Sequence, residues 1–230
     1  MKLLFMPGLD GTGISFEPLR QYLPSDISSP VVKYPYDRLL SFEELVSSAN
    51  EQIQGYQDIV VAESFSGPIA VFLIGTGRLK TKGLVLCATF AVAPRQGMLK
   101  MLRYMPLERI SNLPFQRIIL RFVLGNRNDV DALFPLWQRI KTKVPAKVLA
   151  HRMKMLADID VRRWLPNLST PCCYLQATRD RVIPPSSVHE FTQVIPDLRI
   201  YKVEAPHFIF QAEPEASATV IKEFINIITI

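Results

Sequence analysis

Runs of apolar residues without polar alternation recur along the chain and predict buried strands. Six are expected, at residues 2–6, 31–34, 58–62, 83–88, 172–177 and 199–203. Segments with apolar residues at helical spacing separate most of them. Continuous apolar strands that alternate with helices are typical of a parallel sheet covered on both faces. The pattern therefore predicts an α/β fold with a doubly wound, mostly parallel sheet of about six strands.

The pattern changes between residues 94 and 164. No convincing strand occurs there, and helices are expected near residues 98–105, 115–123, 130–141 and 145–157. Between Arg95 and Arg163 the chain has 15 Lys or Arg and 5 Asp or Glu, so the net charge of +6 comes from this region. The predicted organisation is a core of residues 1–93 and 165–230, with residues 94–164 as an all-helical insertion.

Composition narrows the class of protein. With 230 residues, 48% of them hydrophobic, the chain is expected to bury a sizeable core. No apolar run is long enough to cross a bilayer, and the run at the N-terminus is too short for a signal peptide. Three cysteines lie inside strand-like runs and are interpreted as buried thiols. We expect a cytoplasmic protein without a metal or a cofactor.

One predicted strand ends abruptly at a serine. A buried strand at residues 58–62 is followed by an apolar helix from about Gly67, which leaves Ser64 on the turn between them. Small residues, Ala62 and Ser66, stand two positions before and after Ser64, as a tight, strained turn requires. Ser64 is therefore the candidate nucleophile. The alternatives are a plain helix N-cap at Ser64 and a nucleophilic Ser66.

Two further polar residues, Asp180 and His207, come directly after the last two predicted strands. Because the carboxyl ends of parallel strands meet at one edge of a sheet, we expect both to lie near Ser64. A histidine there would accept the serine proton, and an aspartate would orient the imidazole ring. The weaker candidates for these roles are Asp197, His151 and His189.

These stretches resemble the α/β-hydrolase family. The elbow around Ser64 resembles Gly-x-Ser-x-Gly with both outer glycines replaced, and the order Ser64, Asp180, His207 is the order of that family. Residues 179–184 resemble its acid turn, and residues 205–209 with Glu213 and Pro214 resemble its histidine loop. The resemblance covers essentially the whole chain, beginning at the family's third strand. It implies a Ser-His-Asp catalytic triad and a helical lid at residues 94–164.

The loop at residues 7–13 resembles the stretch that carries the oxyanion hole of α/β-hydrolases. Backbone N–H groups on such a loop stabilise the oxygen that becomes negative during acyl transfer. The resemblance implies the N–H groups of Leu9 and Phe65 as the two donors. A phosphate-binding glycine loop is the alternative, but the spacing of Gly8, Gly11 and Gly13 fits neither a P-loop nor a dinucleotide fingerprint.

The leading hypothesis is a serine hydrolase that cleaves a carboxylic ester or thioester with an apolar acyl group through an acyl-enzyme on Ser64. One alternative is an acyltransferase that passes the acyl group to an alcohol, because residues 7–13 also resemble plant acyltransferases that make phytyl and acylglycerol esters. Another is a non-catalytic binding protein of the same fold. Dehalogenase chemistry is disfavoured because the elbow carries Ser rather than Asp.

The basic insertion has two interpretations. It is either a solvated helical surface or a surface that attracts an anionic partner, such as coenzyme A, an acyl carrier protein or an acidic membrane surface. Nucleic acid is not expected, because the chain has no recognition motif and no interleaved aromatic residues.

Overall fold

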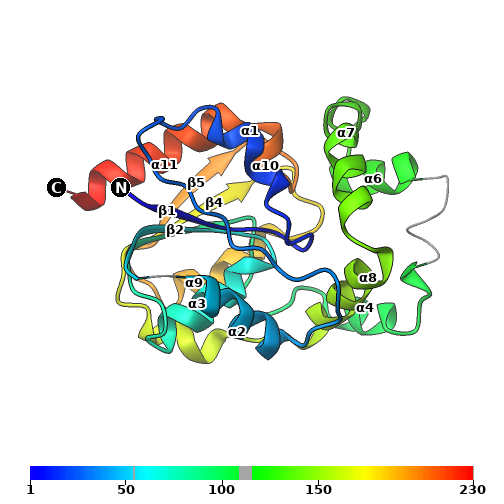
Figure 1. Cartoon of the computed structure of the whole chain (residues 1–230), viewed down its shortest axis with the longest axis horizontal. Coiled ribbons are helices and arrows are strands. Elements are labelled where there is room, and N and C mark those ends of the chain that lie inside the picture. Colours follow the sequence, from blue (N-terminus) through cyan, green and yellow to red (C-terminus); the bar gives the residue numbers. More distant parts are fainter. Residues whose placement is uncertain (54, 109–115, 230) are drawn as a thin grey trace.

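The computed structural model describes residues 1–53, 55–108 and 116–229 (Figure 1). A single five-stranded sheet has the order β1-β2-β3-β4-β5, and every neighbouring pair is parallel. The predicted α/β class with a doubly wound parallel sheet is thus confirmed. The strands are β1 (Leu3–Met6), β2 (Gln57–Glu63), β3 (Thr81–Cys87), β4 (Cys172–Ala177) and β5 (Arg199–Val203).

One of the six predicted strands, at residues 31–34, does not form. Within the described residues this segment runs beside β1 with isolated bridges only, one of them between Val31 and Phe5. The Phe5 N–H donates to the Pro30 carbonyl and the Val32 N–H donates to the Phe5 carbonyl, both at 2.9 Å. Pro30 itself has no N–H to donate, which interrupts the ladder between the bond from the Leu3 N–H to the Ser28 carbonyl and the bond from the Phe5 N–H to the Pro30 carbonyl. The sheet therefore has five strands rather than about six.

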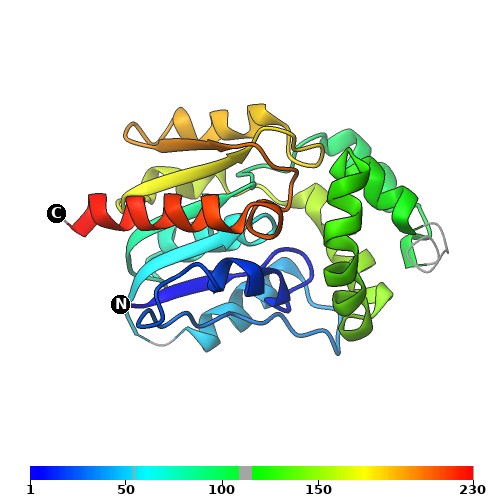
Figure 2. The same ribbon diagram turned by 90° about the horizontal axis from the view of Figure 1, so that it is seen from above.

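Helices cover both faces of the sheet (Figures 1 and 2). The strand side chains alternate between two apolar clusters. Leu3 and Phe5 belong to one cluster, whereas Leu4 and Met6 belong to the other. Burial on both faces explains why the strands read as continuous apolar runs. One face carries α1 (Glu17–Arg20), α10 (Ile209–Ala212) and α11 (Pro214–Thr229), and the other α2 (Phe42–Gln52), α3 (Ser66–Gly75) and α9 (His189–Thr192).

The path of the chain changes direction between β1 and β2. After β1 the chain passes to the outer side of that strand at Val31, and it returns through α2 to form β2 on the inner side. Crevices for ligands form beyond the carboxyl ends of strands at such a reversal. The loop at residues 7–13 follows β1, and Ser64 follows β2. The topology therefore brings these two stretches to the same edge of the sheet.

The helical insertion, residues 94–164, lies between β3 and β4 in the chain. Figures 1 and 2 show its helices beyond the carboxyl ends of the strands. Its described part holds no strand, only an isolated bridge from Asp160 to Val92. Phe115, the first residue of one predicted helix, lies outside the described residues. The helices are α4 (Gln96–Leu102), α6 (Gln116–Leu124), α7 (Arg127–Lys143) and α8 (Ala146–Met155).

Candidate active site

Ser64 occupies a strained turn between β2 and α3. Its φ is 49°, a left-handed value that is uncommon outside glycine. The Ser64 N–H donates to the Cys87 carbonyl at 2.9 Å, and its own carbonyl accepts from the Gly67 N–H at 3.0 Å and from the Thr89 hydroxyl at 2.5 Å. Neighbouring strand and helix therefore hold the conformation in place. Strain of this kind is typical of functional sites.

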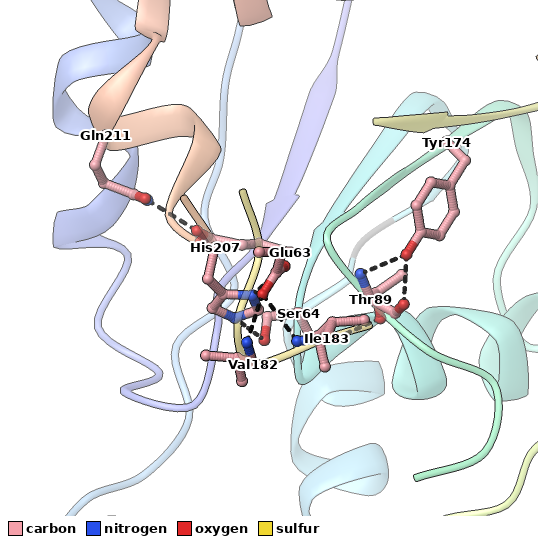
Figure 3. Close-up of polar contacts among 9 residues, drawn as sticks. Glu63, Ser64, Thr89, Tyr174, Val182, Ile183, His207 and Gln211 are labelled. Atoms are coloured by element: carbon pink, nitrogen blue, oxygen red, sulfur yellow. Dashed lines mark hydrogen bonds and ion pairs between the residues drawn. The ribbon is translucent and has the colours of Figure 1, made fainter. Parts of the chain in front are cut away.

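The residues around Ser64 leave room for this turn. Ala62 and Ser66, which replace the outer glycines of the family pattern, are both fully buried. Gly67 is more restricted, because a Cβ there would lie 1.9 Å from Thr89 Oγ1. A glycine is thus required one position later than the small-residue pattern indicates. Thr89 is fixed in turn by Tyr174, whose hydroxyl donates to the Thr89 carbonyl at 2.6 Å (Figure 3).

A continuous series of hydrogen bonds joins Ser64, His207 and Asp180. Ser64 Oγ lies 2.9 Å from His207 Nε2, and His207 Nδ1 lies 2.8 Å from Asp180 Oδ2. His207 is 6% exposed. The second oxygen of Asp180 accepts the N–H groups of Val182 and Ile183, both at 2.8 Å. The structure therefore brings together the three side chains that the sequence places after β2, β4 and β5. Figure 3 shows Ser64 and His207 of this series.

The competing residues lie elsewhere or have other partners. The Ser66 hydroxyl is buried and donates to the Pro7 carbonyl, while it also contacts the Tyr34 hydroxyl. His151 Nε2 lies 3.0 Å from the Leu40 carbonyl. Asp197 and His189 are exposed, in the turn before β5 and on α9 respectively. None of these side chains has a described hydrogen bond to Ser64 or His207.

The loop at residues 7–13 lies against the elbow. A Cβ placed on Gly8 would be 3.9 Å from Ser64 Cβ, so the backbone approaches the serine closely. Gly8 and Gly11 close a turn in which the Gly11 N–H donates to the Gly8 carbonyl at 3.1 Å. Among the hydrogen bonds of the described residues, none uses the N–H of Leu9 or of Phe65 as donor. Neither N–H group is therefore occupied by an acceptor among the described residues.

A buried carboxyl group directly before Ser64 was not anticipated from the sequence. Glu63 is 3% exposed; Gln211 Nε2 donates to its Oε1 at 2.8 Å and the Ser15 hydroxyl to its Oε2 at 3.1 Å (Figure 3). Burial raises the pKa of Glu63, although the bond from Gln211 opposes the shift. The signal was present in the sequence, because an otherwise apolar strand ends on an acid at this position. The network connects the elbow to the segment that follows His207.

The cysteines are free and buried, as predicted. Burial raises the pKa of the Cys172 thiol to about 12, so this side chain is not a reactive thiolate near neutral pH. Among the described residues, His, Cys, Asp and Glu side chains form no group of three or more that could hold a metal ion. In the same residues, no helix has the length and apolar character needed to span a bilayer.

Comparisons with known proteins identify the fold. No protein-family model and no curated protein matches the chain. Among solved structures, an esterase from Exiguobacterium antarcticum has a TM-score of 0.81 at 15% identity, covering 98% of this chain and 92% of its own. A bromoperoxidase from Bacillus anthracis has a TM-score of 0.79 at 14% identity, covering 98% and 91%. An enol-lactonase from Burkholderia xenovorans has a TM-score of 0.78 at 13% identity, with the same coverage.

These matches extend over nearly the full length of both partners in each comparison. At sequence identities of 13–15%, these matches establish the fold and no further property. The chain has the α/β-hydrolase fold.

Proposed function

We propose that the protein is a serine hydrolase that cleaves a carboxylic ester or thioester with an apolar acyl group through an acyl-enzyme on Ser64. The observation that carries the proposal is the hydrogen-bonded series Asp180, His207, Ser64, with distances of 2.8 Å and 2.9 Å. A strained serine, a histidine in reach and a buried acid behind it are the parts that nucleophilic acyl transfer needs. An esterase and a lactonase of the same fold support this assignment.

In the proposed acylation step, His207 Nε2 accepts the proton of Ser64 as Oγ attacks the carbonyl carbon of the substrate. Asp180 holds the other ring nitrogen and stabilises the imidazolium that forms. The carbonyl oxygen becomes negative and receives the N–H groups of Leu9 and Phe65. When the tetrahedral intermediate collapses, His207 returns its proton to the departing alcohol or thiol, and the acyl group stays on Ser64.

In the second step, water donates a proton to His207 and attacks the acyl carbonyl. As this tetrahedral intermediate collapses, His207 returns the proton to Ser64 Oγ, and a carboxylic acid is released. An alcohol in the position of the water would make the protein an acyltransferase. Adding a primary alcohol to the assay separates the two outcomes, since a transferase produces an ester and a hydrolase produces mainly the acid.

We infer that the helical insertion is the lid of this site. Phe208, next to His207, packs against an apolar cluster of the insertion that contains Leu120 and Leu133. This apolar contact beside the base favours an apolar acyl group. The basic charge of the insertion favours an anionic carrier such as coenzyme A. The preference for an anionic carrier is tested by comparing acyl-coenzyme A with p-nitrophenyl esters of the same chain length at low and high salt. The preference for an apolar acyl group is tested by varying that chain length.

Replacing Ser64 by Ala tests the central assignment. The Ser64→Ala variant is expected to lose on the order of 10⁴-fold or more in kcat toward p-nitrophenyl esters, because no covalent intermediate forms. A fluorophosphonate probe is expected to label Ser64 of the unmodified protein, with the site identified by mass spectrometry. Ser47→Ala, at an exposed position on α2, is the matched control and keeps both activity and labelling. A folded Ser64→Ala variant with normal activity would contradict the proposal.

A further inference from the structure

Arg152 on α8 is a buried arginine that contacts backbone instead of acids. It is 2% exposed, and no ion pair among the described residues involves it. Nη1 donates to the carbonyls of Leu9 and Asp10, each at 2.9 Å, and Nη2 donates to the Pro35 carbonyl at 2.7 Å. Burying a cation is costly unless it is well hydrogen-bonded. The planar guanidinium offsets this cost through its bonds to backbone carbonyl oxygens, two of which belong to the loop at residues 7–13.

These bonds fall on the centre of the turn that carries the proposed oxyanion donor. Leu9 and Asp10 are the two central residues of the turn closed by Gly8 and Gly11. The peptide unit between the central residues of a turn is the one whose rotation converts one turn type into another. Arg152 holds the carbonyl of this peptide unit and the next one. It therefore fixes the orientation of the backbone directly after the Leu9 N–H.

A second contact joins the same helix to the end of this loop. Ile14 packs in an apolar cluster with Val148 and Leu149 of α8 and with Ile140 of α7. The guanidinium also approaches the loop so closely that a Cβ on Gly11 would lie 2.7 Å from Nη1. The helical insertion thus contacts the loop in two ways, through the hydrogen bonds of Arg152 and through the apolar packing of Ile14.

We propose that Arg152 is a positioning residue for the oxyanion hole, through which the helical insertion holds the Leu9 N–H in place for acyl transfer at Ser64. This inference rests on the function proposed above, because Leu9 acts as a donor only if an acyl group passes through Ser64. Arg152 itself touches neither the substrate nor the reacting atoms. Its effect is expected in the transition state and not in substrate binding.

Two variants test the proposal. Arg152→Met keeps much of the side-chain length but loses every donor, and Arg152→Lys keeps the charge but not the planar fork. Arg152→Met is expected to lower kcat for p-nitrophenyl butanoate on the order of 10- to 100-fold, with KM changed less than about threefold. Arg152→Lys is expected to fall between this variant and the unmodified protein, and it serves if Arg152→Met does not fold.

A trifluoromethyl ketone with a butyl chain provides a readout that follows the oxyanion. Ser64 adds to its carbonyl carbon, His207 takes the proton, and the ketone oxygen becomes negative. Its inhibition constant is expected to rise by about the factor by which kcat/KM falls, whereas the matching methyl ketone is expected to bind unchanged. Hydrogen exchange of residues 7–13, followed by mass spectrometry, is expected to accelerate in both Arg152 variants.

Arg139→Met is the matched control. Arg139 also joins the helical insertion to the core, through a two-bond ion pair with Glu17 at 2.7 and 2.8 Å, but it has no described contact with residues 7–13. Its kcat and trifluoromethyl ketone inhibition are expected to stay within about twofold of the unmodified protein. An equal loss in Arg139→Met would overturn the specific role of Arg152, and so would a folded Arg152→Met variant with normal kcat and normal inhibition.

The two proposals fail in different ways. An unmodified protein that neither hydrolyses esters nor reacts with the fluorophosphonate refutes the proposed function and, with it, the role of Arg152 in acyl transfer. An active, labelled protein whose Arg152→Met variant is equally active refutes the role of Arg152 alone.

Discussion

The two loops beside the Ser64 hydroxyl are held by different parts of the chain. The elbow is held by the sheet and by residues next to it, because Ser64 bonds to the Cys87 carbonyl, to Gly67 and to Thr89. The loop at residues 7–13 is held partly by α8, because Arg152 donates to the Leu9 and Asp10 carbonyls, and partly by the Tyr34 N–H, which donates to the Gly11 carbonyl at 2.9 Å. One described bond joins the two loops, from the Ser66 hydroxyl to the Pro7 carbonyl.

This difference separates the nucleophile from one of the two proposed oxyanion donors, the Leu9 N–H, whereas the other donor, Phe65, lies on the elbow itself. A change in the sheet is expected to reach the elbow and the stability of the whole domain, because the sheet is the core. A change in the helical insertion is expected to reach the Leu9 N–H while the turn at Ser64 stays as it is. The contribution of Leu9 to stabilising the oxyanion can therefore be altered separately from the reactivity of the serine.

The largest loss of stability is expected from Gly67→Ala. The new Cβ would lie 1.9 Å from Thr89 Oγ1 and 2.7 Å from Thr89 Cβ, and Thr89 cannot withdraw without losing its bond to the Ser64 carbonyl. Overpacking of this kind is expected to lower the free energy of unfolding by about 3 kcal/mol. Urea unfolding measures the loss.

Gly77→Ala is the control for this substitution. Gly77 has a φ of 73°, and a Cβ at this position would have no atom within 4 Å, so only the backbone conformation opposes alanine. The expected loss is about 1 kcal/mol. Equal losses at the two glycines would mean that Thr89 does not confine the elbow.

A smaller loss of stability and a larger relative loss of activity are expected from Gly11→Ala. Gly11 has a φ of 72°, and a Cβ there would lie 2.7 Å from both Arg152 Nη1 and Tyr34 Cβ. The guanidinium can move away, but it then releases the Leu9 carbonyl. We expect kcat to fall roughly 10-fold. In an Arg152→Met background the same substitution should lower kcat little further, and fully additive losses would contradict a shared mechanism.

The positions of Ser64, Asp180 and His207 could be predicted from the sequence, because each follows a run that reads as a strand. Parallel strands bring such positions together whatever their separation in the chain. The error at residues 31–34 also has a cause visible in the sequence, since Pro30 cannot donate to a ladder.

Arg152 could not be predicted in the same way. In the sequence Arg152 is one of 15 basic residues between Arg95 and Arg163, and its role depends on how α8 packs against the core. One sign was available: Arg152 stands three and four residues after Leu149 and Val148, on the apolar face of its helix. A cation on a buried face requires a partner, but the partners here are backbone carbonyls, which leave no pattern in the sequence.

The smallest change in stability is expected at Glu63, which directly precedes Ser64 in the elbow. This change depends on pH. Burial raises the pKa of Glu63 in the folded protein above its value in the unfolded chain. At a pH below the unfolded value the group is protonated in both states, so its burial carries no ionisation cost. As the pH rises through the folded pKa, the unfolded state has already released its proton, and the folded state loses stability relative to it.

Glu63→Gln removes this titration while keeping a group that can bond to Gln211 and Ser15. The free energies of unfolding of the two proteins are expected to converge at acidic pH, and the variant is expected to become the more stable one as the pH rises toward 7. Urea unfolding at a series of pH values measures the difference, in which contributions of all other groups cancel. Glu43→Gln, an exposed acid on α2, is the control. An unmodified protein that is more stable than Glu63→Gln at pH 7, by a margin that shrinks toward acidic pH, would mean that the charged Glu63 carboxylate stabilises the elbow.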